Sequence, residues 1–218
     1  MSVRILEYTN KYPLSLIGEA AGICWGSNVS DDDRNIQRAI VCINNGHERV
    51  AEFGDVYMVL EGYSARTIRE LYTHIGGMPT RLQASTRYIN YKDFDYITHP
   101  HFNENQNEIY KEAMEKSISY YKKLLDAGVA KEDAANILPL GMQTTIVYRI
   151  NARALITMSH QRECKRAYWE YRDGIMKDIK EALSNYSPQW KCIVDTWFQP
   201  KCKYLGYCPE KNGCNSIK

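Results

Sequence analysis

The stretch MQTTIVYRINARALITMSHQR, Met142–Arg162, decides the fold that the sequence predicts. Its first nine residues, Met142–Ile150, are rich in β-branched side chains, which favour a β-strand. Asn151 follows directly, and an asparagine side chain can cap the first turn of a helix, here extending to about Cys164. A strand that leads straight into a helix predicts a chain that combines sheet and helix.

The rest of the chain adds more helices than strands. Short apolar runs at Val3–Thr9 and Phe53–Gly62 predict two further strands. Helical spacing and capping signals predict the helices, which are Pro13–Trp25, the segment between Asp31 and Asn45, Ala65–Ile75, Asn107–Gly128, Lys131–Ile137 and about Ala167–Ser184. Long helices with few strands predict an α+β fold.

The domain organisation follows from length and from the absence of a linker. The 218 residues suit one domain, and no internal repeat or stretch rich in Gly, Ser or Pro divides them. From Pro188 onward no regular pattern is evident, and cysteines are frequent. We therefore predict one domain over residues 1–187 and an irregular, cysteine-bearing tail over residues 188–218.

Charge and composition limit the partners that the chain can have. The 28 basic and 26 acidic residues give a net charge of +2, which provides no general attraction to nucleic acid. No run reaches the roughly 18 apolar residues of a membrane span, and the N-terminus lacks the apolar segment of a secretory signal. We expect a cytoplasmic protein with mostly reduced thiols, bound to neither membrane nor nucleic acid.

A polar segment, PTRLQASTRYINY (Pro79–Tyr91), is the first candidate site. Arginine can bind a phosphate through two hydrogen bonds, hydroxyl groups and backbone amides can complete an anion site, and glutamine can pair with a nucleobase edge. The residues concerned are Arg81, Gln83, Ser85, Thr86 and Arg87. A solvated strand face with surface ion pairs explains the same pattern, and spacing alone favours that simpler interpretation.

Two further clusters of charge have both a functional and a structural interpretation. Arg162 and Arg166 lie four residues apart, so we expect them to share one helix face, where they could stabilise an anion. A charged helix face with acidic partners is the alternative. The turn Asn44–Phe53, NNGHERVAEF, crowds ionisable groups around His47 and Arg49, which indicates either a site or a polar surface turn.

The seven cysteines do not predict a metal site. Cys202, Cys208 and Cys214 repeat at six-residue intervals, whereas zinc sites usually pair cysteines two to four residues apart. Surface thiols, or a disulfide formed on oxidation, explain the tail better than a four-thiolate site with Cys192. Cys164 is next to basic residues in sequence, but neighbouring residues of a helix point apart, so we assign no cysteine a nucleophilic role.

Taken together and in this order, these segments resemble the flavin-dependent thymidylate synthases. The resemblance extends from about Ile5 to Gly213 and rests on EAAGICW, GHERVAEF, LQASTRY, ILPL followed by NARAL, and RAYWEYR. It implies the fold of the thymidylate synthase complementing proteins, a mixed β-sheet flanked by helices. It also implies a homotetramer with active sites at the subunit junctions, and conversion of dUMP to dTMP with FAD as cofactor, methylenetetrahydrofolate as carbon donor and NADPH as reductant.

The resemblance also implies roles for individual residues. Arg162 is the implied catalytic residue, which faces the uracil edge and stabilises negative charge as N3 loses its proton. Arg87 is placed on the nucleotide phosphate, and the implied nucleotide-binding residues are Gln83, Ala84, Ser85, Thr86, Arg87 and Arg162. The residues implied to bind or adjoin the cofactor are His47, Arg49, His74, Gly76, Gly77, Arg81, Asn151, Arg153 and Arg166.

Several positions depart from the family pattern. Ile75, Gly76 and Gly77 stand where the family motif begins with Arg-His-Arg, and Asn136 and Thr157 replace an arginine and an asparagine. Each lost charge-assisted hydrogen bond is worth about 1.5–3 kcal/mol. The neighbouring His74 and Arg81 and the bare glycine amides are candidate replacements. The departures keep two alternatives open, a related flavoprotein acting on another pyrimidine nucleotide and a catalytically silent nucleotide-binding relative.

Overall fold

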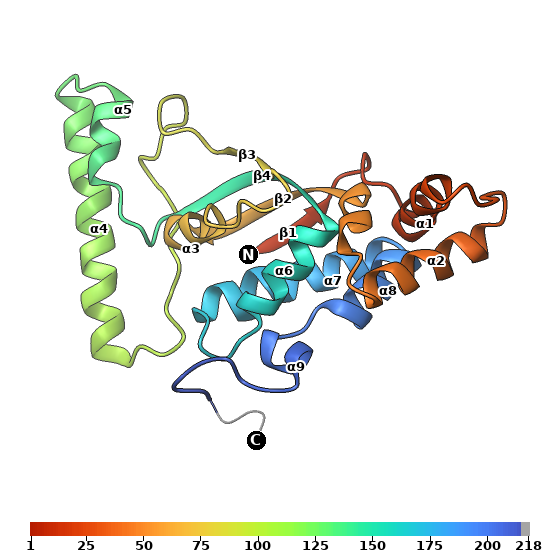
Figure 1. Cartoon of the computed structure of the whole chain (residues 1–218). Helices are drawn as coiled ribbons and strands as arrows, with labels where there is room; N and C mark the ends of the chain where they lie inside the picture. The colour runs from red at the N-terminus through yellow and green to blue at the C-terminus, as the bar shows by residue number, and fades with distance from the viewer. Residues whose placement is uncertain (215–218) are drawn as a thin grey trace. The chain divides into compact units, whose positions relative to one another are not determined.

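The structure of the chain is a computed structural model that describes residues 1–214 (Figure 1). Within that range the strands form one four-stranded sheet in the order β1-β2-β4-β3. The long strands β2 (Asp55–Ser64) and β4 (Gln143–Asn151) are central, and the short strands β1 (Ser2–Ile5) and β3 (Thr80–Gln83) form the edges. A sheet with many helices confirms the predicted α+β fold.

The β-branched run that opened the sequence analysis forms β4 as predicted. Thr144, Ile146, Tyr148 and Ile150 are buried, while the residues between them are half-buried or exposed. Side chains of a strand point alternately to opposite faces, so this pattern gives β4 one fully covered face. The strand predicted over Val3–Thr9 is shorter in the structure, because β1 ends at Ile5 and the chain then turns.

The described chain forms two compact units, and the division between them crosses β2 after Val59 and β4 after Ile146. The first unit contains Leu60–Thr73 and Leu82–Ile146. Its helices are α3 (Ala65–Leu71), α4 (Glu104–Asp126) and α5 (Lys131–Ala134), followed by the 3-10 turn Ala135–Ile137.

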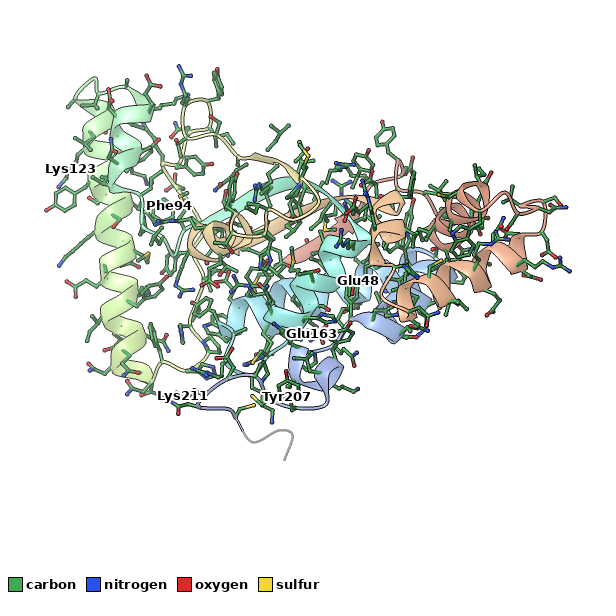
Figure 2. All side chains as sticks on the ribbon, in the orientation of Figure 1. Glu48, Phe94, Lys123, Glu163, Tyr207 and Lys211 are labelled. Atoms are coloured by element: carbon green, nitrogen blue, oxygen red, sulfur yellow. The ribbon has the colours of Figure 1, made fainter. Side chains whose placement is uncertain are left out.

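Helix α4 has the amphipathic pattern that the sequence predicts. It begins at a capping box, in which the Asn103 side chain accepts from the Gln106 amide and the Gln106 side chain accepts from the Asn103 amide. Its buried residues Met114 and Tyr121 lie seven positions apart, on one face. Tyr121 belongs to a small core with Phe94, which is labelled in Figure 2.

The second unit contains Ser2–Val59, His74–Arg81 and Val147–Lys218, of which the structure describes residues up to 214. Its helical segments in chain order are α1 (Pro13–Cys24), α2 (Asp32–Asn44), the 3-10 helix η1 (Glu48–Phe53), α6 (Ala152–Arg162), the π-helix η3 (Glu170–Met176), α7 (Lys177–Tyr186), α8 (Pro188–Trp197) and α9 (Lys201–Leu205). No helix of residues 1–214 is long and apolar enough to cross a membrane.

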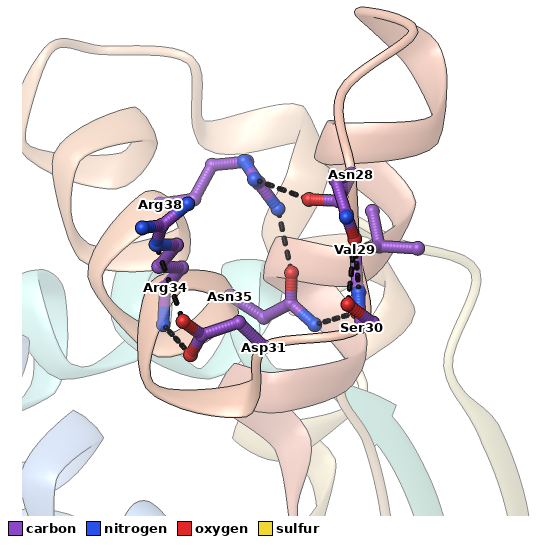
Figure 3. A network of polar contacts seen from close by, with 7 residues as sticks. All are labelled: Asn28, Val29, Ser30, Asp31, Arg34, Asn35 and Arg38. Atoms are coloured by element: carbon purple, nitrogen blue, oxygen red, sulfur yellow. Dashed lines mark hydrogen bonds and ion pairs between the residues drawn. The ribbon is translucent and has the colours of Figure 1, made fainter.

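Helices α1 and α2 pack closely because a glycine faces the crossing. A Cβ atom at Gly18 would overlap the backbone oxygen of Asn35. The Arg38 guanidinium donates to the Asn35 side chain at 2.6 Å and to the Gly18 carbonyl at 3.0 Å, and Asn35 donates to the Val29 carbonyl at 2.8 Å. Figure 3 shows the part of this network that links α2 to the turn before it. Polar side chains make these links.

The prediction of an irregular chain from residue 188 is wrong for α8 and α9. Ser187 caps α8, and Pro188 occupies its first turn. The buried residues Trp190, Ile193, Val194 and Trp197 follow the i, i+3, i+4, i+7 pattern of one helical face. The apolar stripe is therefore present in the sequence, although the frequent cysteines of this region suggest an irregular chain. Residues 215–218 of the predicted tail lie outside the described residues.

Candidate functional site

Asn151 joins the N-terminus of α6 to the segment that follows α3. Its side-chain oxygen accepts a hydrogen bond from the Ala154 amide at 2.9 Å, which confirms the predicted helix cap. Its side-chain nitrogen donates to the Gly77 carbonyl at 3.4 Å. Gly77 has φ +72°, and a Cβ there would lie 2.5 Å from that nitrogen. Both the backbone conformation and the close contact therefore require glycine at position 77.

A hollow of about 290 Å³ opens beside this contact. Its lining residues are Glu52, His74, Gly76, Gly77, Arg153, Ala154 and Thr157. Nothing lies within 4 Å of the position that a Cβ of Gly76 would take, so the backbone is open there. The Arg153 guanidinium donates to the Glu52 carboxylate at 2.6 Å, which fixes this cation at the wall of the hollow. A guanidinium and bare glycine backbone are groups that suit a phosphate.

Arg162, the last residue of α6, is held by two aromatic side chains. Its Nε donates to His74 Nε2 at 2.9 Å, and its guanidinium carbon lies 4.6 Å from the centre of the Tyr171 ring. Burial, followed by the positive charges of Arg162 and Arg81, lowers the pKa of His74 to about 4. His74 is therefore neutral at physiological pH and can accept a hydrogen bond from a cation.

Arg162 also lines a second hollow of about 560 Å³, together with Arg166, Lys201 and four cysteines, Cys164, Cys202, Cys208 and Cys214. All four cysteines are outside disulfides. Among residues 1–214, no group of three or more His, Cys, Asp or Glu side chains is arranged to hold a metal ion. The lining of the second hollow therefore includes both basic side chains and thiols.

The prediction that Arg162 and Arg166 share one helix face is wrong. Helix α6 ends at Arg162, and Arg166 lies in the turn that follows. The Arg166 guanidinium instead donates to the Glu210 carboxylate at 3.2 Å and to the Asn212 carbonyl at 3.1 Å. Arg166 thus anchors the segment after α9, an interaction between distant parts of the sequence that helical spacing cannot predict.

Five of the six nucleotide-binding candidates, Gln83–Arg87, lie on the first unit at the end of β3, and Arg162 lies on the second. Gln83 donates to the Thr144 hydroxyl at 3.4 Å, and the Ala84 amide donates to the Thr145 carbonyl at 2.8 Å. The Ser85 hydroxyl accepts from the Arg87 amide at 3.2 Å, and Thr86 lies in the same turn. Strand β4 therefore positions the start of this segment. Hydrogen bonds within the segment shape the rest of it.

The Arg87 side chain makes a surface ion pair. Its Nε donates to the Glu132 carboxylate at 2.6 Å, and the two side chains are 66% and 51% exposed. An exposed pair of this kind contributes about 0–1 kcal/mol to stability. The structure therefore shows the surface ion pair of the simpler interpretation. Because breaking this ion pair costs little free energy, Arg87 could exchange the carboxylate for a phosphate.

The remaining candidates are found on the second unit. His47 and Arg49 are exposed at the start of η1, the turn that also carries Glu52. Arg81 on β3 is half-buried and close enough to affect the pKa values of both His74 and Tyr148. Sequence reasoning missed Tyr171, because one tyrosine in YWEYR carries no spacing signal that distinguishes it from a core residue.

The chain matches known proteins over most of its length. The family model described as thymidylate synthase complementing protein matches residues 4–189. The chain belongs to this family. The flavin-dependent thymidylate synthase of Thermococcus onnurineus (strain NA1) is 31% identical over 96% of this chain and 89% of its own length. That of Thermococcus kodakarensis (strain ATCC BAA-918 / JCM 12380 / KOD1) is 32% identical over 95% of this chain and 89% of its own length.

Solved structures support the same fold for this family member. The crystal structure of flavin-dependent thymidylate synthase ThyX from Helicobacter pylori, complexed with FAD and dUMP, matches with a TM-score of 0.72 at 19% identity. The match covers 91% of this chain and all of that one. The resemblance to the flavin-dependent thymidylate synthases is therefore confirmed, and so is the fold that it implies.

Two departures from the family pattern, Asn136 and Thr157, have a structural explanation in this chain. Asn136 donates to the Asp133 carbonyl at 2.9 Å and so completes a local turn after α5. Thr157 donates to the Arg153 carbonyl at 3.1 Å and lines the hollow beside His74. Both side chains are engaged with their own helical segments.

Proposed function

We propose that this chain is an FAD-dependent thymidylate synthase that converts dUMP to dTMP, with methylenetetrahydrofolate as carbon donor and NADPH as reductant. Family membership over residues 4–189 supports the reaction class. The observation that carries the proposal in this chain is Arg162, a guanidinium held at one edge by His74 and on one face by Tyr171. A fixed cation is what a developing pyrimidine anion needs.

The residues around the smaller hollow fit part of FAD. We assign the cofactor to Asn151, Arg153 and the backbone of Gly76 and Gly77, with His47 and Arg49 on the adjoining turn and His74, Arg81 and Arg166 as further candidates. The volume of about 290 Å³ is small for a whole dinucleotide, so we assign the remainder of the cofactor to a junction between subunits. When bound, FAD supplies the redox chemistry of the methyl transfer.

We assign the nucleotide to two arginines, with Arg87 on the phosphate and Arg162 at the uracil edge. Gln83, Ala84, Ser85 and Thr86 complete the nucleotide site with a side-chain amide, backbone groups and hydroxyls. Binding of the phosphate releases Arg87 from Glu132, which costs little because that pair is exposed. In this proposal the two guanidiniums act on one nucleotide in the assembled oligomer.

Arg162 acts on the reaction by electrostatics. A guanidinium does not lose its proton in proteins, so Arg162 cannot serve as the general base. Its positive charge stabilises the uracil ring as N3 loses a proton, and the surrounding aromatic groups keep the charge in place. The proposal requires no enzyme thiolate. Burial raises the pKa of the Cys42 thiol, so this cysteine stays protonated at neutral pH.

The test is a direct assay of the purified protein. We expect the protein to bind FAD, seen as flavin absorbance, and to release tritium from 5-tritiated dUMP in the presence of methylenetetrahydrofolate and NADPH. Protein that takes up no FAD would refute the proposal. FAD binding without turnover of any nucleotide would identify a silent relative.

A second candidate is a flavoprotein of this family that acts on a different pyrimidine nucleotide. Gly76 favours it, because open backbone occupies a position where the family pattern has a charged or polar side chain. The same assay with a panel of pyrimidine nucleotides separates the two, since the second candidate predicts turnover of another nucleotide and little of dUMP.

The organisation of the protein completes the proposal. We propose a cytoplasmic homotetramer with active sites at the subunit junctions, built from a catalytic domain over residues 1–187 and a segment over residues 188–218. Light scattering of the FAD-loaded protein tests the tetramer, and a stable monomer with full activity would exclude shared sites.

A further inference from the structure

The contact between His74 and Arg162 fixes the proton of the imidazole ring. The two nitrogens, Arg162 Nε and His74 Nε2, lie 2.9 Å apart. A guanidinium has donors and no acceptor, so His74 Nε2 must carry a lone pair, and the proton of the neutral ring must lie on Nδ1. His74 is therefore an acceptor for a cation, and a protonated ring would repel Arg162.

The surroundings of His74 favour this neutral form. Burial lowers its pKa to about 4, with Arg162 and Arg81 as further causes. The charged groups that line the same hollow are Glu52 and Arg153, and these two form an ion pair with each other. The Tyr171 ring lies 5.8 Å from the His74 ring on another side. Proton uptake by His74 at neutral pH is therefore disfavoured.

The second contact of Arg162 restricts the plane of its guanidinium. Tyr171 is fully buried, and its hydroxyl donates to the Met158 sulfur at 3.3 Å, so its ring is fixed beneath the cation. The bond to His74 is made by Nε, so it restrains the guanidinium at the atom that joins it to the aliphatic stem. The ring contact and the Nε bond both restrict the orientation of the guanidinium.

We propose that His74 is a positioning residue that orients Arg162 for the pyrimidine. This inference rests on the proposed function and replaces a cofactor-binding role for His74 with a role that acts through another residue. Holding a long side chain before the ligand arrives removes the entropic cost of ordering it during binding. His74 should therefore raise nucleotide affinity without touching the nucleotide.

The test uses two amide variants that differ only in reach. The side-chain oxygen of glutamine can occupy the position of His74 Nε2 and accept from Arg162, whereas that of asparagine is too short. We expect His74→Asn and His74→Ala to raise the dUMP dissociation constant of the FAD-loaded protein about tenfold, as loss of a hydrogen bond to a charged group predicts. His74→Gln should remain within about threefold of the wild type.

Coupling to Arg162 separates positioning from a general structural effect. In an Arg162→Ala background, His74→Ala should have no further effect on the dUMP dissociation constant measured by calorimetry. FAD content and melting temperature should match the wild type in His74→Gln and His74→Asn. His101→Ala, a histidine of the exposed loop before α4, serves as the matched control and should bind dUMP normally.

Distinct outcomes would overturn this inference and the proposed function. If His74→Asn binds dUMP as tightly as the wild type, or if the loss persists in the Arg162→Ala background, the positioning role is refuted while the proposed function stands. Loss of FAD in proportion to loss of dUMP binding would make His74 a cofactor ligand. If the wild type binds no dUMP, the proposed function fails. Nitrogen NMR of His74 then still tests the contact, since protonated Nε2 contradicts it.

Discussion

Arg162 contacts His74 and the Tyr171 ring, and its position at the end of a helix makes its removal informative. The residue is half-buried at the end of α6, where a truncated side chain leaves the helix intact. At the scale of single residues, the proposed loss of function at Arg162 can therefore be measured separately from any loss of folding.

Arg162→Ala should abolish dTMP formation while the protein stays folded. Removal of one electrostatic stabiliser of a transition state costs about 10²- to 10³-fold in rate. Tritium release from dUMP measures the loss, and circular dichroism and flavin absorbance check the fold. Wild-type turnover in this variant would contradict the role assigned to Arg162.

Arg87→Ala should weaken dUMP binding and leave stability nearly unchanged. Its ion pair with Glu132 is exposed and worth at most about 1 kcal/mol, whereas a charge-assisted bond to the phosphate is worth about 1.5–3 kcal/mol. Glu132→Gln is the control, because it releases Arg87 and should bind dUMP at least as tightly as the wild type. An equal loss of dUMP affinity in Arg87→Ala and Glu132→Gln would show that the ion pair itself shapes the site. Calorimetric titration measures both.

Gly77→Ala should destabilise the protein, and Gly76→Ala should not. An alanine at Gly77 adopts a left-handed conformation at a cost of about 1–2 kcal/mol, and its Cβ displaces the Asn151 cap. The neighbouring Gly76 has open space at the same atom. Urea unfolding of the two variants measures the difference, and equal stabilities would contradict the geometry of this turn.

At the scale of helices and strands, local sequence signals predicted most elements and failed where distant contacts decide. β4, α6 with its Asn151 cap and α4 follow from residue type and spacing. The end of α6 at Arg162 could not be predicted in this way, because Arg166 is bound by Glu210, which lies 44 positions later in the sequence. The pairing of His74 with Arg162 spans 88 positions, and no local pattern encodes it.

Helix α8 was not predicted from the sequence, and its buried tryptophan allows its contribution to stability to be tested. Trp190 is fully buried and donates from its ring nitrogen to the Asn10 carbonyl at 2.9 Å. Trp190→Ala should lower the free energy of unfolding by about 3–5 kcal/mol. Trp25→Ala is the matched control, because that ring is 59% exposed and its loss should cost about 0.5 kcal/mol or less. Chemical denaturation distinguishes them, and similar losses would contradict the burial of α8.

For the whole molecule, the balance of charge leaves anion binding to local groups. With 28 basic and 26 acidic residues, the chain has little net field to attract a nucleotide. Two half-buried histidines, His74 and His160, have shifted pKa values. Burial lowers the pKa of His160 as well as that of His74, so both resist protonation in the folded state.

The free energy of unfolding should therefore fall as pH falls from about 6.5 to about 4. In that window the unfolded chain binds a proton at His74 that the folded chain does not, so stability rises with pH. Arg162 and Arg81 face His74 with like charge once it is protonated, and Glu52 in the same hollow is paired with Arg153. Carboxylates titrate over the same range, so the measured quantity is the difference between wild type and His74→Gln. Parallel pH profiles would contradict the buried, neutral histidine.

The π-helix Glu170–Met176 has a consequence for changes in chain length. A π-turn contains one residue more than an α-helical turn, and Tyr171 lies within it. A chain shortened by one residue here would regain a regular helix and rotate every later side chain by about 100°. The Tyr171 ring and the apolar face of α7 could not then both keep their places. If α7 keeps its packing, a single deletion in this turn would displace the Tyr171 ring and so disturb a guanidinium on a different helix.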